Sequence, residues 1–174
     1  MNDNEKTIWK IDTAHSEINF KVKHMMISTV TGSFEKFDGN IETTASDFND
    51  ADFSFSATID SINTNNKDRD AHLKSDDFFG VEKYPELIFK SKSFDGDKMI
   101  GDITIKGITQ QITIDAEYNG TAVDPYGQTK AGFEFEGNLN RKDFGLTWSA
   151  VTEAGNVVVS DKVKLIASLQ FVKQ

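Results

Sequence analysis

Cysteine is absent from this 174-residue chain, and positive charge is scarce in it. Without cysteine the protein has no disulfide, no thiolate ligand for a metal ion and no cysteine nucleophile. Lysine and arginine number 19 against 28 aspartate and glutamate residues, which gives a formal net charge of −9. A negative field repels phosphate, so nucleic acid is not an expected partner, and electrostatic docking on an anionic membrane is disfavoured.

Long hydrophobic runs are missing as well. The sequence has no stretch of 18 apolar residues, and its opening MNDNEKTIWK lacks the apolar core of a signal peptide. We therefore expect no stable membrane insertion and a cytoplasmic location, with a periplasmic one only if a signal peptide has been removed. The two prolines fall outside the segments that alternate between apolar and polar residues, so these segments are free to form strands.

Phenylalanine is the residue that the sequence has in excess. There are 14 Phe but only three Tyr and two Trp. Phenylalanine carries no polar group, so it suits places that offer neither water nor a hydrogen-bond partner. The composition therefore indicates a large, wholly apolar interior.

Apolar and polar residues alternate with period two in at least eight segments. This period predicts strands with one apolar face, and turn-forming pairs such as Asp95-Gly96 and Asn119-Gly120 separate several of them. No linker or fixed repeat divides the sequence, so we predict a single all-β domain. Between Phe34 and Phe37 the alternation slips by one residue, which predicts a bulge or a sharp bend. Outside residues 63–91, no window longer than a few turns has helical periodicity.

Strands of this kind form either a sandwich or a closed barrel. Segments of about ten residues reach roughly 33 Å, which is longer than a compact filled core needs. The length of the segments and the many phenylalanines favour a deep apolar barrel. A sandwich whose phenylalanines pack on one another is the alternative.

Motifs of catalysis and metal binding are not found in the sequence. It has no G-x-S-x-G and no phosphate-binding glycine loop, and the calcium-loop pattern of DRDAHLKSDD fails at Leu73, where glycine is required. His15, His24 and His72 are 9 and 48 residues apart, which matches no short metal-ligand motif. We therefore predict no catalytic residue, no metal site and no required cofactor.

Five segments in a fixed order resemble the YceI-like, polyisoprenoid-binding family. They are DTAHSEINFKVKH (12–24), VTGSFEKFDGNI (30–41), NKDRDAHLKSDDFFGVEKYPELIFKS (66–91), GDITIKGITQQITI (101–114) and NRKDFGLTW (140–148). The resemblance implies an extended, lipocalin-like, eight-stranded antiparallel β-barrel over residues 9–174 with one or two short helices, after a flexible tail of residues 1–8. It also implies no catalytic residues, and it favours a homodimer because such proteins are often dimeric.

The resemblance further implies an apolar tunnel that holds a polyisoprenoid, an isoprenoid quinone or another long-chain lipid. We predict that inward-facing residues of the strands line this tunnel and that Phe144 and Trp148 close one end. The predicted lining residues are Phe20, Val22, Phe34, Phe53, Phe55, Ile59, Leu87, Phe89, Ile103, Ile105, Ile112, Ile114, Phe133, Phe135, Leu139, Phe144, Trp148, Leu165 and Leu169.

A polar segment, residues 63–75, interrupts the alternation. It is predicted to form a short helix and loop across the outside or one end of the barrel. Ser75 is a predicted N-cap of a second short helix, from which Phe78 and Phe79 plug the barrel end. Pro85 is predicted to stop that helix.

Two arginines are candidates for either a structural or a ligand-binding role. Arg69 lies beside Asp68 and Asp70, and Arg141 is close to Asp143, so each is predicted to anchor a loop through a bidentate pair. Alternatively, Arg69, His72 or Arg141 faces the tunnel mouth and binds the polar head group of the ligand, since guanidinium binds phosphate well.

The expected function is non-catalytic binding, storage or transport of a long-chain isoprenoid or a similar amphiphilic lipid. One alternative is an enzyme acting on a prenyl compound, which needs a polar group deep in the tunnel. The other is a stress-response module in which the lipid is only a structural filler.

Overall fold

The computed structural model describes residues 5–45, 47–148 and 158–174, which form a strand-rich fold with one α-helix. The strands are β1 (Thr7–Ile11), β2 (Glu17–His24), β3 (Ser28–Phe34), β4 (Phe37–Thr43), β5 (Asp52–Thr58), β6 (Ile62–Asn63), β7 (Glu86–Phe94), β8 (Lys98–Ile105), β9 (Ile108–Val123), β10 (Thr129–Asn140) and β11 (Val159–Lys173). The helices are α1 (Lys67–Lys74) and the short 3₁₀ segments η1 (Thr13–His15), η2 (Ile59–Ser61) and η3 (Arg141–Phe144).

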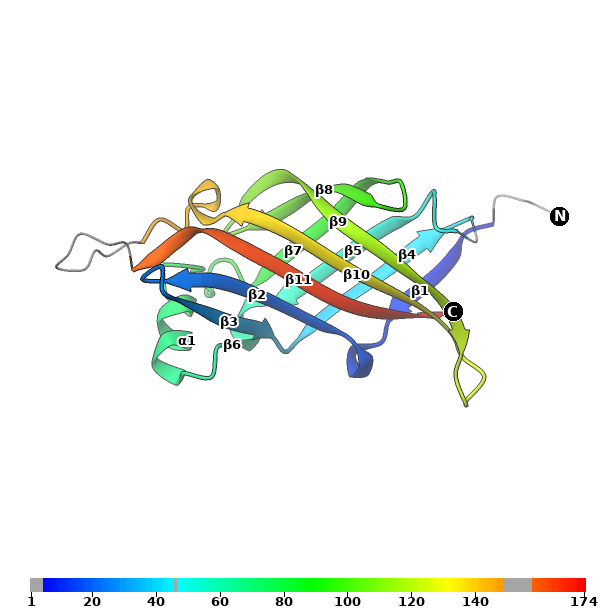
Figure 1. Ribbon diagram of the computed structural model, residues 1–174, viewed down its shortest axis with the longest axis horizontal. Coiled ribbons are helices and arrows are strands. Elements are labelled where there is room, and N and C mark those ends of the chain that lie inside the picture. The colour runs from blue at the N-terminus through cyan, green and yellow to red at the C-terminus, as the bar shows by residue number, and fades with distance from the viewer. Residues whose placement is uncertain (1–4, 46, 149–157) are drawn as a thin grey trace.

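Eight strands close into a ring in the order β1, β4, β5, β7, β8, β9, β10, β11 and back to β1. Every neighbouring pair is antiparallel, and the closing pair places Trp9 of β1 opposite Lys173 of β11. Figure 1 shows a long barrel whose strands run diagonally along its length, with α1 near one end. The predicted eight-stranded antiparallel barrel is confirmed.

Three pairs of consecutive strands are each separated by a sharp bend in the barrel wall. η1 separates β1 from β2, Glu35 and Lys36 separate β3 from β4, and η2 separates β5 from β6. β2 pairs with β11 and β3, and β3 also pairs with β6, so the wall continues on the far side of each bend. The slip in alternation between Phe34 and Phe37 is therefore a bend, as predicted.

The bend at η1 is held by the carboxylate of Asp12. It accepts hydrogen bonds from the backbone N–H of Ala14 (3.1 Å) and the ammonium of Lys130 (2.7 Å), and it lies 2.8 Å from Nδ1 of His15. The hydrogen bond from Lys130 holds the pKa of Asp12 below its ordinary value. Because Lys130 belongs to β10, this contact ties the bend to a strand that is distant in sequence.

The first strand corrects the predicted boundary at residue 8. β1 begins at Thr7, which pairs with Thr43, and Ile8 pairs with Glu42, so neither residue belongs to a tail. Trp9 of this strand is buried and pairs with both β4 and β11. Residues 1–4 of the predicted tail lie outside the described residues.

The polar segment forms α1 and then turns. The side chain of Asn66 caps α1 by accepting a hydrogen bond from the backbone N–H of Arg69 (3.0 Å). The predicted second helix is wrong: the hydroxyl of Ser75 donates backward to the carbonyl of His72 (2.5 Å), so Ser75 ends α1, and turns follow as far as Lys83. Among the described residues, no helix is long and apolar enough to cross a membrane.

Asp50 organises the connection between β4 and β5. Its carboxylate accepts hydrogen bonds from the hydroxyls of Thr43 (2.6 Å) and Thr44 and from the backbone N–H groups of Thr44 and Ala45. These bonds, led by that from the Thr43 hydroxyl, hold the pKa of Asp50 well below its ordinary value. Within this connection, Phe48 has a positive φ of 62° and its side chain is fully buried. The connection therefore inserts this ring into the barrel.

We expect acid to loosen this connection. A carboxyl group whose folded pKa is depressed stabilises the native structure above its ordinary pKa of 3.8 and loses this effect as the pH falls through the folded pKa. Hydrogen-exchange protection factors of the Thr44 and Ala45 amides should therefore fall between about pH 5 and pH 2, and Asp50→Asn should lower them at every pH. Asp47→Asn is the control, because among the described residues the Asp47 carboxylate accepts its hydrogen bond from the backbone N–H of Asn49 and none from Thr44 or Ala45. Unchanged wild-type protection at pH 2 would contradict this role of Asp50.

Candidate ligand-binding cavity

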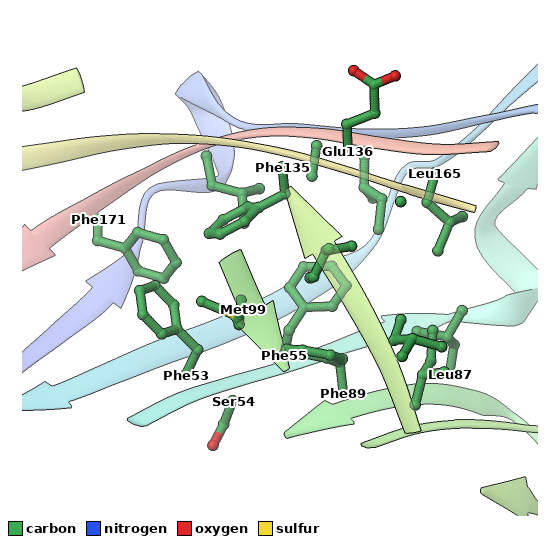
Figure 2. A pocket seen from close by; sticks show the side chains of 17 residues that line it. Phe53, Ser54, Phe55, Leu87, Phe89, Met99, Phe135, Glu136, Leu165 and Phe171 are labelled. Atoms are coloured by element: carbon green, nitrogen blue, oxygen red, sulfur yellow. The ribbon is translucent and has the colours of Figure 1, made fainter. Parts of the chain in front are cut away.

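An apolar cavity of about 80 Å³ lies inside the barrel. In Figure 2 the rings of Phe53, Phe55 and Phe135 surround it, and the hydroxyl of Ser54 and the carboxylate of Glu136 point away from it. The cavity is lined by Ile18, Phe53, Ser54, Phe55, Leu87, Phe89, Met99, Ile103, Ile112, Ile114, Phe135, Glu136, Gly137, Leu165, Ala167, Leu169 and Phe171. Its wall therefore offers a ligand hydrocarbon contact and almost no polar side chain.

Ten of the predicted lining residues line this cavity. They are Phe53, Phe55, Leu87, Phe89, Ile103, Ile112, Ile114, Phe135, Leu165 and Leu169. The prediction missed Ile18, Met99, Ala167 and Phe171, which also line it. All four belong to the period-two runs, so strict alternation could have identified them.

The other nine predicted residues do not line the cavity. They are Phe20, Val22, Phe34, Ile59, Ile105, Phe133, Leu139, Phe144 and Trp148. Most of them fill the barrel beyond the cavity, and the ring of Phe34 lies 5.7 Å from that of Phe20 and 6.3 Å from that of Phe79. Alternation predicts which face of a strand a residue occupies, but not its depth along the barrel, and this is why these residues were misplaced.

The end of the barrel near α1 is closed by aromatic side chains. The ring of Phe78 lies 5.4 Å from that of Trp148, and both pack on His72, at 5.1 and 4.9 Å. Phe78 is buried and Phe79 packs against the core. The prediction that Phe78 and Phe79 plug the barrel end therefore agrees with their packing, although a turn rather than a helix presents them.

A cluster of rings fills the opposite part of the barrel. Phe133, fully buried, is its centre, with six neighbouring rings at centroid distances from 5.1 to 6.3 Å. These rings belong to Phe48, Phe53, Phe94, Tyr118, Phe135 and Phe171. We call this the Phe133 cluster. Phe53, Phe135 and Phe171 of this cluster line the cavity, and the buried rings of Phe48 and Phe133 fill the barrel beyond them, so the cavity ends at the cluster.

Two inward-facing glycines set the width of the bore. A Cβ on Gly101 would lie 2.5 Å from Cζ of Phe89, and one on Gly32 would lie 2.2 Å from Cζ of Phe20. Both contacts are shorter than van der Waals separation allows, so only glycine lets each ring lie flat against the neighbouring strand. Phe89 can therefore line the cavity without filling it.

Arg141 is buried and saturated with backbone acceptors. Its guanidinium donates to the carbonyl oxygens of Leu146 (2.6 Å), Trp148 (2.7 Å) and Ser160 (3.0 Å), and Nη2 lies 3.7 Å from the carboxylate of Asp161. Desolvation lowers the pKa of Arg141, and the charge of Asp161 opposes this shift. The predicted partner Asp143 is wrong, because the arginine joins η3 to the start of β11. This arrangement favours the structural role.

Arg69 and His72 also have partners outside the cavity. The guanidinium of Arg69 donates to the hydroxyl (2.8 Å) and the carbonyl (2.6 Å) of Thr64, and not to a neighbouring aspartate as predicted. Asp70 instead accepts from the Thr64 hydroxyl (2.6 Å), while Nε2 of His72 lies 2.9 Å from Asp77. The two residues hold α1 on its loop, and their role in binding a head group stays a prediction.

The described residues contain no group of three or more His, Asp or Glu side chains arranged to hold a metal ion. Titratable groups with shifted pKa values, such as Asp12 and Asp50, serve bends and connections and do not line the cavity. The cavity is lined by hydrocarbon, whereas a second hollow of about 290 Å³ over β9, β10 and β11 includes the carboxylates of Asp115, Glu117, Glu134 and Glu136.

Comparisons with known proteins agree with the fold. The chain is 40% identical over 166 residues to a UPF0312 protein of Staphylococcus aureus strain N315, covering 95% of this chain and 97% of that protein. A crystal structure of the Campylobacter jejuni YceI protein superposes with a TM-score of 0.73 at 32% identity, over 87% of this chain and 90% of that one.

A polyisoprenoid-binding domain from Saccharophagus degradans has the same fold, with a TM-score of 0.71 at 15% identity over 95% of this chain and 98% of that one. The family model described as the YceI-like domain matches residues 9–171, almost the whole length of the chain. Sequence, barrel topology and family model agree, and the protein therefore belongs to the YceI-like family.

Proposed function

We propose that the barrel binds the apolar tail of a long-chain isoprenoid or a similar amphiphilic lipid, and that it stores or transports this lipid without chemical change. The observation that carries the proposal is the cavity inside a closed barrel, lined by hydrocarbon side chains from seven strands. Burial of apolar surface is the main attraction that such a wall can offer. The homodimer and the cytoplasmic location stay predictions from the sequence.

The size of the cavity requires the lining side chains to move when a long tail binds. About 80 Å³ is small beside the roughly 300–1,000 Å³ of typical ligand pockets. Each buried methylene contributes roughly 0.8 kcal/mol, so a tail of about 20 carbons offers about 16 kcal/mol of gross stabilisation. Even after the costs of immobilising the tail, about 4–15 kcal/mol, a surplus is available to rotate rings that line the cavity.

The alternative of an enzyme acting on a prenyl compound has less support. Catalysis needs a nucleophile, an acid or a base within hydrogen-bonding reach of the substrate. The polar side chains at the cavity, Ser54 and Glu136, point away from it (Figure 2). The proposal is therefore a binding function with low selectivity between similar tails, since one methylene changes the affinity little.

Native mass spectrometry of the protein purified from isoprenoid-producing cells tests the proposal. We expect a bound mass that organic solvent extracts and that is identified as a long-chain lipid. The protein stripped by extraction should then take up a polyene alcohol, a fluorescent apolar probe, and release it to an unlabelled prenyl alcohol. Purification of ligand-free protein that also fails to take up the probe would refute the proposal.

Phe89→Ala should enlarge the cavity, whereas Ile88→Ala should not. Phe89 is buried and lines the cavity, but Ile88, its neighbour in β7, is partly exposed on the outer face. Removing a buried phenyl ring destabilises a protein by about 3–5 kcal/mol, and truncating Ile88 should cost about 1 kcal/mol or less. Saturating prenyl alcohol should restore more of the lost stability in Phe89→Ala than in Ile88→Ala, as measured by urea unfolding. Equal restoration would place the ligand elsewhere.

Arg141 distinguishes a structural role from head-group binding. Truncation in Arg141→Ala leaves several buried carbonyls without donors, each costing about 1–3 kcal/mol, so we expect a large loss in the free energy of unfolding. Arg141→Lys keeps the charge but loses the forked set of donors, so its free energy of unfolding should lie between those of the wild type and Arg141→Ala. If Arg141 instead bound an anionic head group, Arg141→Lys would keep its stability and selectively lose affinity for a prenyl phosphate relative to the prenyl alcohol.

A further inference from the structure

The barrel wall is incomplete between β9 and β10. Their ladder begins at the pair Val123–Thr129 and ends at Asp115–Glu136. Beyond that pair, β9 continues to pair with β8 as far as Ile108, and β10 continues to pair with β11 as far as Asn140. Along residues 108–114 of β9 and 137–140 of β10, each strand thus has a partner only on its other side.

A second contact closes the gap at its far end. There Nε2 of Gln110 donates to the carbonyl of Asp143 (3.3 Å), just after β10. Close by, a Cβ on Gly145 would lie 3.3 Å from Cδ1 of Ile108, so η3 packs against the start of β9. The gap is therefore a window with two fixed ends, and we call residues 111–114 and 137–140 the β9–β10 window.

The window opens onto the cavity. Ile112, Ile114 and Gly137 line the cavity and also lie along the window. Both isoleucines are half-buried, whereas Leu87 and Ile103 on other strands of the cavity wall are only 3% and 2% exposed. Phe55 on β5 and Leu165 on β11 are half-buried too, so solvent reaches the cavity wall at the window but not at the window alone.

One side chain fills the window at the cavity. Gly137 faces inward, and a Cβ there would lie 2.2 Å from Cγ2 of Ile114 across the window. Ile114 therefore occupies the space that a side chain at position 137 would take. The same Cβ would lie 3.9 Å from Cα of Ile114, so the two strands stay close at this pair and the Ile114 side chain fills the space between them. Rotation about its side-chain torsions would clear that space, and such rotations are fast compared with loop or domain motion.

The two ends of the barrel offer harder routes. At one end the Phe133 cluster and Phe48 lie beyond the cavity. At the other end the rings of Phe78 and Trp148 pack at a tilt of 46°, and the carbonyl of Trp148 accepts a hydrogen bond from Arg141. Passage through either end requires several packed rings to move together. At the end near α1, the segment from Leu146 to Trp148, which Arg141 holds, would have to move as well.

We propose that the apolar tail enters and leaves the cavity sideways through the β9–β10 window, with Ile114 as the gate. This inference rests on the proposed function, because it concerns the route of the tail and not its binding. It places the head group outside the barrel wall, next to the last pair of the ladder, Asp115 and Glu136.

The ladder end of the window carries more carboxylates than ammonium groups. Asp115 faces Glu136 across the ladder, and Glu117 faces Glu134 in the next outward-facing pair. Lys98 and Lys164 form ion pairs with Asp115 and Glu136, which leaves four carboxylates against two ammonium groups. This surplus repels an anionic head group and slows its approach, so an uncharged head group is favoured.

Cross-linking the window tests the route. If the ladder continued, Thr113 would face Asn138, and both are exposed. In this cysteine-free chain, Thr113→Cys/Asn138→Cys joined by a bismaleimide closes the window from outside. The matched control is Lys21→Cys/Thr31→Cys joined by the same reagent over the intact ladder between β2 and β3, where both residues are exposed.

Loading and release of the polyene alcohol are measured by stopped-flow fluorescence. We expect the closed window to slow both rates by about tenfold or more and the control to change them by about twofold or less, because only the first cross-link blocks a gate. Unchanged rates in the window variant, or equal slowing in both, would overturn the proposed route. Failure of the wild-type protein to bind the probe at all would instead refute the proposed function.

The gate residue gives an independent test. Ile114→Ala should raise the loading rate by about tenfold, because it removes the side chain that fills the window. Ile103→Ala makes the same truncation in the cavity wall on β8, and should change the release rate with little effect on loading. Equal loading rates in the two variants would exclude Ile114 as the gate. Glu136→Gln should speed the loading of an anionic fatty-acid probe more than that of the alcohol, and an equal effect would exclude control of loading by the rim charges.

Discussion

Closure of the ring between β1 and β11 is the constraint on which the structure depends. Three register pairs, from Trp9–Lys173 to Ile11–Phe171, join the first and last strands and close the ring. Closure puts every inward-facing side chain into one enclosed space, which a barrel of about eight strands can either fill or leave free for a small ligand. This chain does both: the Phe133 cluster fills one part, and a cavity remains beside it.

Stability and free space compete inside such a barrel. A void lined by apolar groups loses packing contacts, so a protein gains stability by filling it. Here glycines limit the filling, because Gly101 accepts the ring of Phe89 and Gly137 accepts the side chain of Ile114. Both side chains lean on a neighbouring strand and can move away from it without any change in the backbone. The cavity is therefore small at rest and lined by groups that can give way to a ligand.

The sequence predicted the faces of the strands well and their depth poorly. Period two is a local property, so Phe53, Phe55 and Phe89 could be assigned to the interior directly. Whether an inward residue reaches the cavity depends on register between strands far apart in sequence, and Phe133 and Ile105 were misplaced for that reason. The hydrogen bond from Arg141 to Ser160 and the pairing of β1 with β11 were missed for the same reason, because each joins residues that are separated in the sequence. The prediction for Ser75 was wrong for a different reason. A serine hydroxyl can hydrogen-bond to the backbone before or after it, and the sequence did not decide between the two.

Two regions of the protein would contribute to binding the proposed lipid: the hydrocarbon wall of the cavity would contact the tail, and the outer surface would contact the head group. The hydrocarbon wall supplies most of the attraction, but it is non-directional and distinguishes one tail from another only weakly. Charge and hydrogen bonding can distinguish head groups, yet the cavity wall has almost no polar side chain with which to do so. Discrimination must then occur where the head group meets the outer surface, and the route of the tail decides where that is. A lateral window makes the β9–β10 rim, with its paired carboxylates, the selective region, whereas passage past α1 would give this role to Arg69 and His72.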